Sequence, residues 1–209
     1  MKIYYCSLWL VLLLLIGCEP QTNDVTLLDD APEAKLIVTE KIMSPQERAL
    51  QNKIAARALL QQVIDQKEAT QKEDILFECS TTTGGLLTKI KTEEEWLAIK
   101  FAQTKAATSN FYHLYYNNNQ LQLVVHEIQT WQGETQQIVQ TILYLEQGMI
   151  FHCLTKKATA NVDNIEQAIA TASLESSAAP LELWESIQAE EIKWQQLINK
   201  QNIAYHYCS

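Results

Sequence analysis

The residue with the most specific predicted chemistry is Cys18, which follows Leu15-Ile16-Gly17 at the end of an apolar run. A cysteine thiol can be alkylated to a thioether. A small residue such as Gly17 is what a membrane peptidase needs before the bond that it cuts. Order and spacing therefore predict cleavage after Gly17 and covalent modification of Cys18.

Residues 1–17 have the organisation of an export signal, with Lys2 at the start and an apolar stretch from Leu8 to Ile16. Together with Cys18, this segment resembles the signal of bacterial lipoproteins. The resemblance is confined to the N-terminal segment, and the folded part resembles no family that we recognise. It implies that Cys18 carries fatty acyl chains such as palmitate, which would hold the protein at a membrane.

Two other interpretations of the apolar stretch were weighed. An uncleaved helix needs about 20 residues to cross about 30 Å of hydrocarbon, and the stretch from Ile3 to Gly17 is shorter. A plain secretory signal could be cut elsewhere. We favour the lipoprotein signal. Because Glu19 rather than aspartate follows Cys18, we expect an outer-membrane protein that faces the periplasm.

Composition limits the choice of partners. The chain has 209 residues and a formal charge of -9, and residues 1–17 contribute only the positive charge of Lys2. A mature chain that is still more acidic disfavours nucleic acid and anionic head groups. The length suits one domain with a tether. We expect a signal peptide over 1–17, a lipidated N-terminus and tether over 18–34, and a single domain over 35–209.

Three cysteines are left for the exported domain, because Cys6 is removed with the signal and Cys18 is lipidated. In an oxidising compartment they form at most one internal disulfide. Cys79 and Cys153 lie in expected strands, which makes them a candidate pair. Cys208 could instead bond either of them or another molecule.

The histidines are the other residues with metal-binding or acid–base chemistry, namely His113, His126, His152 and His206. His113 and His126 flank an expected turn and could approach each other. A zinc or copper site needs three convergent ligands, and the sequence has no H-x-H, H-E-x-x-H or C-x-x-C motif. In a strand, His152 and Cys153 point to opposite faces. We expect half-buried histidines, with no metal and no other cofactor.

Other catalytic patterns are weak. There is no G-x-S-x-G elbow. The run 80–85 (STTTGG) precedes an expected strand rather than a helix, which favours a turn over a phosphate cradle. The run 93–95 (EEE) is typical of a solvated edge rather than of paired glycosidase carboxylates. A hydrolase with a dispersed catalytic triad is the remaining enzymatic alternative, and we favour a protein without enzymatic activity.

Sequence patterns that predict helices occur at both ends of the expected domain. Ser44-Pro45-Gln46-Glu47 is a capping box with proline at the first helical position, and a helical apolar period follows. This predicts a helix over about 45–71. A short helix is expected over 163–172, and a last helix over about 181–199. The expected buried stripe of the last helix is Leu183, Ile187, Trp194, Leu197 and Ile198.

Between these helices the pattern changes to strands and turns. Strands are expected over 75–79, 86–91, 111–116, 121–131, 136–146 and 149–155. The segment 92–103 is ambiguous between a capped helix and a strand, and we take it as a strand. Three asparagines at 117–119 favour a tight hairpin turn. Short connections make sequential strands antiparallel neighbours. The predicted fold class is α+β, an antiparallel meander of about five or six strands packed with an N-terminal and a C-terminal α-helix.

The strand over 111–116 has apolar or aromatic side chains on both faces. Either helices cover both faces, or one face is an exposed aromatic platform of the kind that marks interaction sites. The candidate binding surface consists of Tyr112, Tyr115, Tyr116 and Trp131.

The predicted function is that of a lipid-anchored, non-catalytic periplasmic module that binds a protein or another envelope component. Its membrane contact would be the lipidated Cys18. The alternatives are an envelope hydrolase of unknown reaction and an inhibitor-like lipoprotein that blocks an enzyme with its sheet face.

Overall fold

The computed structural model describes residues 43–93, 95–198 and 207–208. The expected signal peptide (1–17), the expected lipidation site Cys18 and the expected tether (18–34) lie outside the described residues, as does His206. Within the described part of the chain, no helix is long and apolar enough to cross a bilayer.

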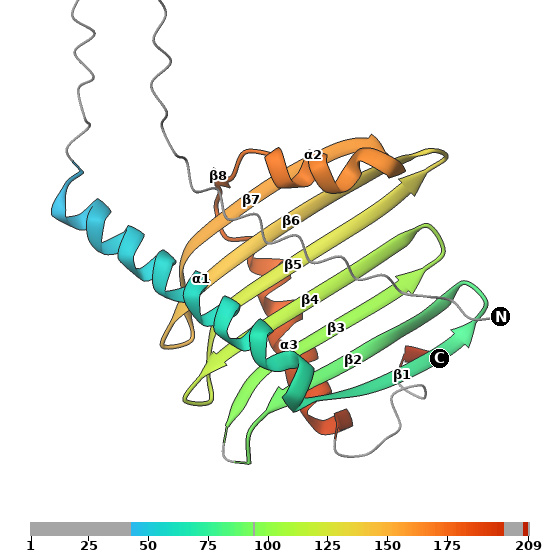
Figure 1. The fold of residues 1–209 in the computed structure, drawn as a ribbon, viewed down its shortest axis with the longest axis horizontal. Coiled ribbons are helices and arrows are strands. Elements are labelled where there is room, and N and C mark those ends of the chain that lie inside the picture. Colours follow the sequence, from blue (N-terminus) through green and yellow to red (C-terminus); the bar gives the residue numbers. More distant parts are fainter. Residues whose placement is uncertain (1–42, 94, 199–206, 209) are drawn as a thin grey trace, which may run out of the picture. The chain divides into compact units, whose positions relative to one another are not determined.

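One antiparallel sheet carries the fold, and the spatial order of its eight strands is their order in the chain (Figure 1). The strands are β1 (Lys72–Ser80), β2 (Thr83–Lys91), β3 (Trp96–Lys105), β4 (Thr108–Asn117), β5 (Gln120–Gln132), β6 (Thr135–Glu146), β7 (Met149–Asn161) and β8 (Glu175–Ser176). The predicted α+β class with an antiparallel meander is confirmed. The expected number of five or six strands was wrong. One additional strand is β8, which forms in the expected linker because β7 offers a pairing edge at Leu154 and Thr155.

Local turn chemistry sets the hairpins. Asn118 and Asn119 both have positive φ angles, 50° and 56°, as a two-residue hairpin turn of type I′ requires. Most of the ambiguous segment 92–103 lies in β3 (Trp96–Lys105), so the strand interpretation is confirmed. Thr92 Oγ1 accepts a hydrogen bond from the Glu95 amide at 3.0 Å. This capping-type bond lies at the β2–β3 connection and not at the start of a helix.

The N-terminal helix, α1 (Pro45–Gln71), has the predicted bounds and the predicted cap. The Glu47 amide donates to Ser44 Oγ at 3.2 Å, and the Ser44 amide donates to Glu47 Oε2 at 2.7 Å. Ile64 of α1 is fully buried, at 1% exposure. Ile54 and Leu60 pack beside it against the sheet.

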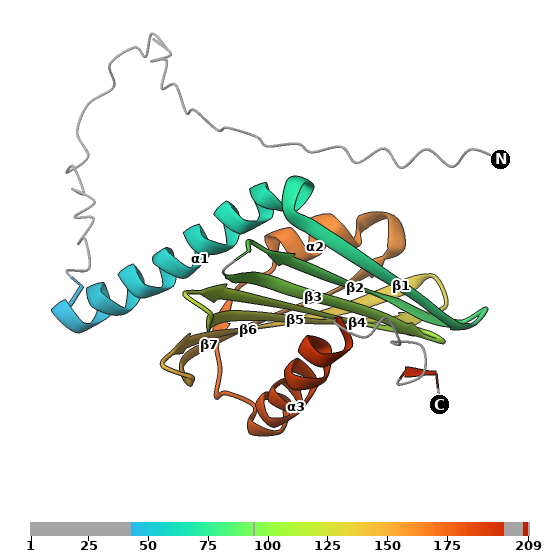
Figure 2. The same ribbon diagram turned by 90° about the horizontal axis from the view of Figure 1, so that it is seen from below.

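Helices lie against both faces of the sheet. A 3₁₀ turn, η1 (Val162–Asn164), leads into α2 (Ile165–Thr171), and α3 (Leu181–Ile198) follows β8. α1 and α2 lie on one face, and α3 lies on the opposite face (Figure 2). In α3, Ile187 and Trp194 are fully buried and Leu183 is half-buried, in agreement with the predicted stripe. The side chains of Leu197 and Ile198 lie outside the described set.

Because helices cover both faces of the sheet, most of the predicted aromatic binding surface is not exposed. Tyr115 packs under α1 and is 0% exposed, and Tyr116 packs in the core beneath α3 and is 2% exposed. Tyr112 is half-buried beside Trp194, with ring centroids 5.4 Å apart. Strand alternation sends adjacent tyrosines to opposite faces, and a helix covers each of them. No platform therefore forms at these three residues.

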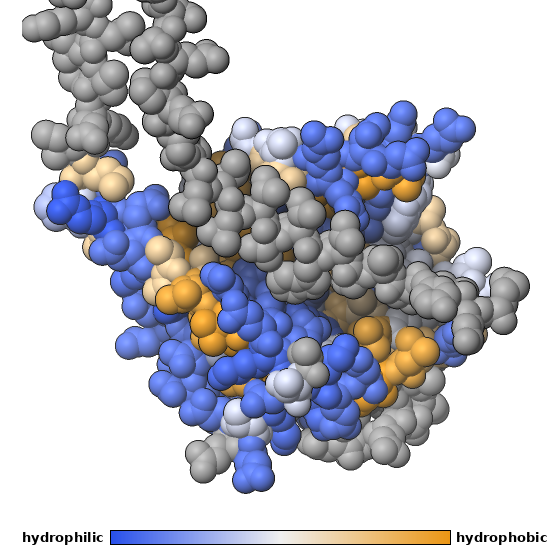
Figure 3. Space-filling model, viewed as in Figure 1, coloured by the Kyte–Doolittle hydropathy of each residue, from blue (hydrophilic) through white to orange (hydrophobic). Residues whose placement is uncertain are grey.

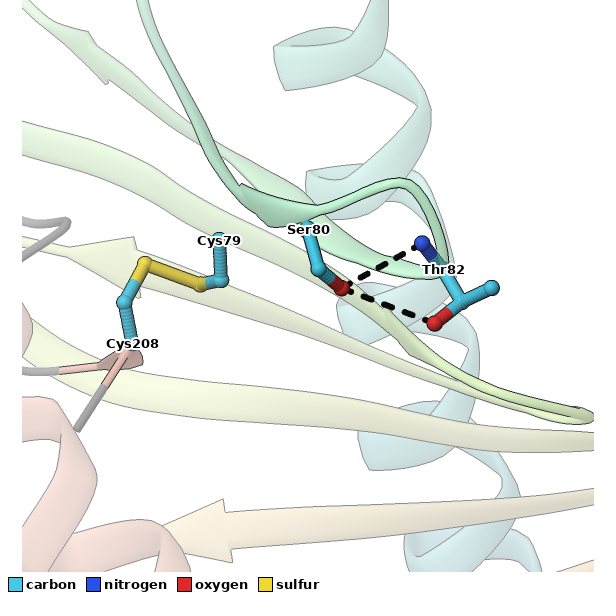
Figure 4. The surroundings of a disulfide bond; sticks show 4 residues. All are labelled: Cys79, Ser80, Thr82 and Cys208. Carbon is cyan, nitrogen blue, oxygen red and sulfur yellow. Dashed lines mark hydrogen bonds between the residues drawn. A yellow bond between two sulfur atoms is a disulfide. The ribbon is translucent and has the colours of Figure 1, made fainter.

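The disulfide differs from the candidate pair. Cys79 bonds Cys208 (Figure 4), and Cys153 is a free, buried thiol. Cys79 lies on β1 and Cys153 on β7, with five strands between them in the sheet. Neighbouring strands are about 4.8 Å apart, so these two thiols are too distant to bond. Cys153 Sγ lies 3.2 Å from Ser177 Oγ instead.

Candidate functional site

The histidines do not converge. The register places His113 opposite Val125 and Tyr112 opposite His126, so the two imidazoles lie on opposite faces of the sheet. His152 lies near Tyr144, with ring centroids 5.9 Å apart, on the face that α1 covers. Within the described ranges, no group of three or more His, Cys, Asp or Glu side chains could hold a metal ion.

The run 80–85 lies at the β1–β2 hairpin, as expected for a turn. Its residues line a wide, open hollow of about 570 Å³ together with Leu76, Leu86 and Ala102. Figure 3 shows hydrophobic side chains over α1 and near the end of β1 and β2, with hydrophilic side chains around them. Leu76 is 73% exposed. Hydroxyl groups of Ser80 and of the threonines 81–83 and 104 also line the hollow, together with Glu78.

A second cavity lies between α1 and the sheet and has a different lining. Its volume is about 300 Å³. Helix α1 contributes two side chains, and four adjacent strands contribute the others from alternating positions. The lining residues are Gln61, Asp65, Lys100, Phe111, His113, Tyr115, Val125, Glu127 and Gln140. We call this the α1 cavity. It is the candidate site because charged, amide, imidazole and aromatic groups converge there on regular secondary structure.

An ion-pair cluster forms one wall of the α1 cavity. Lys100 Nζ lies 3.0 Å from Asp65 Oδ1 and 2.6 Å from Glu68 Oε2. The Lys100 side chain is only 15% exposed. The Tyr115 hydroxyl donates to Asp65 Oδ1 at 3.1 Å. Burial and the nearby Asp65 carboxylate raise the pKa of Tyr115 far above its usual range, so this hydroxyl stays protonated and holds α1 to β4.

A carboxylate held by amides forms the other wall. Glu127 Oε1 accepts from Gln129 Nε2 at 2.7 Å, and Glu127 Oε2 accepts from Gln140 Nε2 at 2.8 Å. Gln136, which is 5% exposed, donates from Nε2 to Gln129 Oε1 at 2.9 Å. Both carboxylate oxygens are thus fixed in direction. No Lys, Arg or His of the described residues forms an ion pair with Glu127.

His113 lies between the two walls. Burial lowers its pKa, and the positive charge of Lys100 lowers it further, against smaller opposing effects of Asp65 and Glu127. The imidazole is therefore neutral near pH 7. A neutral imidazole has one ring nitrogen that donates and one that accepts a hydrogen bond.

The lining offers a ligand several charged and hydrogen-bonding groups. The set contains no serine, threonine or cysteine side chain. The Tyr115 hydroxyl already donates to Asp65. What the site offers is a fixed array of acceptors and donors beside the ring of Phe111.

The sequence pointed to some of the residues of this site. His113 and Tyr115 were considered as chemical or surface residues, whereas Asp65, Lys100 and Glu127 were not singled out. Trp131 is half-buried and lies opposite Gln136, at the far end of the β5–β6 pair, and it does not line the α1 cavity. The available signal was the alternation of Glu127 and Gln129 shortly after the apolar run Leu123-Val124-Val125 of the same strand.

Family models, curated proteins and solved structures were all compared with the chain, and nothing matches it. The class of the protein therefore follows from the fold and the site alone: an α+β meander with a polar cavity under its N-terminal helix.

Proposed function

We propose that this protein is a lipid-anchored, non-catalytic protein of the bacterial envelope that binds an envelope component through the α1 cavity. Cys18 would carry the acyl chains, and the protein would face the periplasm from the outer membrane. The observation that carries the binding role is the Glu127 carboxylate, whose two oxygens are both oriented by glutamine amides at the cavity wall. Groups fixed in advance lose little entropy when a ligand arrives.

Anchoring is tested by metabolic labelling with radioactive palmitate. We expect label in the wild type and none in Cys18→Ala, because the thioether sulfur is absent. Cys6→Ala is the matched control, since that cysteine leaves with the signal peptide, and it should label like the wild type. Equal labelling of Cys18→Ala and the wild type would rule out the anchor.

Location is tested by separating the inner and outer membranes on a density gradient. The wild type should band with outer-membrane markers, and Cys18→Ala should appear in the soluble periplasmic fraction. A wild-type band with the inner membrane would contradict the predicted location without affecting the anchor.

Binding through the α1 cavity is tested by a photoreactive amino acid in intact cells. We expect a discrete adduct when it replaces Gln61, which lines the cavity from α1 and is not one of the amides that hold Glu127, and no such adduct when it replaces Glu134, an exposed residue between β5 and β6. The same adducts from both positions, or none from Gln61, would contradict a binding role for this cavity.

A further inference from the structure

Resting on the binding role proposed above, we propose that the α1 cavity takes a cationic group, an ammonium or a guanidinium, with Glu127 as its principal partner. The proposal follows from the charges around the cavity, the nature of its wall and its size.

The first argument for a cation is the net negative charge around the cavity. Lys100 is the cation of the lining, and it lies within ion-pair distance of both Asp65 and Glu68. That cluster therefore has one negative charge in excess. Glu127 adds another and pairs with neutral amides only, among the described residues. An anionic ligand would be repelled here, whereas a cation would gain from each carboxylate.

The hydrogen-bonding groups are the second step. An ammonium has three donors and no acceptor, and a guanidinium has five donors. A suitable site therefore presents acceptors. Glu127 and Asp65 present carboxylate oxygens, and the neutral His113 ring presents an acceptor nitrogen. Because Gln129 and Gln140 hold the Glu127 carboxylate in place, it need not reorganise when a charge-assisted hydrogen bond forms.

An aromatic ring is the third step. Phe111 lies directly opposite Glu127 in the β4–β5 register and lines the same cavity. Cations are attracted to the face of an aromatic ring within about 6 Å. A carboxylate and a ring on neighbouring strands can therefore contact one cation together.

Size is the fourth step. A cavity of about 300 Å³ is at the lower end of ligand sites in proteins. It suits the end of one long side chain or a small amine. The cation could thus come from a free small molecule or from a lysine-bearing chain, and the test separates these sources.

The test uses the mature, lipidated protein in detergent and isothermal titration calorimetry. The probes are Nα-acetyl-lysine amide and Nα-acetyl-norleucine amide, whose side chain has the same four carbons without the ammonium. We expect the charged probe to bind at least about tenfold more tightly, the usual effect of a hydrogen bond to a charged group. Equal affinity for the two probes would overturn the proposal.

Two variants assign the effect to the cavity. Glu127→Gln should weaken binding of the charged probe about tenfold or more, and Phe111→Leu should weaken it by a smaller factor. Glu134→Gln removes the same charge from an exposed turn and should leave affinity within about twofold. Full affinity in both cavity variants, measured on proteins with wild-type circular dichroism, would overturn the proposal.

A third probe, an acetylated peptide with a central lysine, identifies the source of the cation. Tighter binding of the peptide than of the single amino acid indicates a chain, and equal binding indicates a small amine. If no probe binds while the Gln61 photo-adduct persists, the cationic ligand is wrong and the binding role stands. If the adduct is also absent, both proposals fail.

Discussion

His126 stacks on Tyr112 across β4 and β5, with ring centroids 4.4 Å apart. Its Nε2 is buried and has no hydrogen-bond partner among the described residues. Burial lowers the pKa of His126 to about 4, because an imidazolium there would lose its hydration without gaining a partner. The neutral ring is thus a structural component of the sheet face beneath α3.

This pKa predicts a dependence of stability on pH. The folded value lies below the ordinary value of about 6.5, so the unfolded chain binds more protons between about pH 6.5 and pH 4. The free energy of unfolding should therefore fall as pH falls through this window, by at most about 3 kcal/mol from this residue. Urea unfolding of the wild type and of His126→Phe at about pH 7.5, 6, 5 and 4.5 measures the difference.

The comparison isolates one residue, because His113, whose pKa is also lowered, is present in both proteins. The variant should show the shallower pH dependence. Parallel curves for the two proteins would mean that His126 does not titrate as its surroundings indicate.

Loss of the Cys79–Cys208 bond should destabilise the domain. The bond links residues 129 positions apart and brings Tyr207 against Phe101, with ring centroids 4.9 Å apart. Replacing both cysteines by serine should lower the free energy of unfolding by about 2–4 kcal/mol. Thermal unfolding with and without dithiothreitol provides the check: the reductant should lower the wild-type midpoint and leave that of the double variant unchanged.

Gly85 should not tolerate a side chain. A Cβ there would overlap the carbonyl oxygen of Ala102 and the ring of Phe77. We expect Gly85→Ala to cost about 2–3 kcal/mol, because a backbone oxygen in a paired strand cannot move away. Gly84→Ala is the matched control: its nearest contact would be the Phe77 carbonyl at 3.0 Å, so its cost in denaturant unfolding should be smaller. The reverse order would contradict the packing described here.

Lys100 should stabilise the contact between α1 and the sheet. Removing its charge with Lys100→Met leaves Asp65 and Glu68 as half-buried carboxylates close to each other on α1. We expect a loss of about 2 kcal/mol, less than for a fully buried pair because both carboxylates are partly exposed. The same substitution should cost less in a background with Asp65→Asn and Glu68→Gln. A double-mutant cycle measured by urea unfolding tests this coupling, and an equal cost in both backgrounds would argue against it.

Much of the local structure was predictable because its causes lie within a few residues. Ser44, Pro45 and Glu47 fix the start of α1 through a cap that spans a single turn. The asparagines at 117–119 fix a hairpin because they tolerate positive φ angles. Alternation along 111–116 also indicated correctly that His113 and Tyr115 share one face and Tyr112 and Tyr116 the other.

The contacts between residues that are distant in the sequence were revealed only by the tertiary structure. Cys79 and Cys153 were the candidate pair because both lie in expected strands, but the sheet places five strands between them, and Cys79 bonds Cys208, the alternative partner, instead. The α1 cavity likewise joins Asp65, Lys100 and Glu127, which come from one helix and two strands. Hydrophobic periodicity, helix caps and turn residues depend on residues that are close together in the sequence, so they can be recognised from the sequence alone. Which distant side chains meet depends on strand order, register and the path of a helix across the sheet, and these are settled only when the whole core packs.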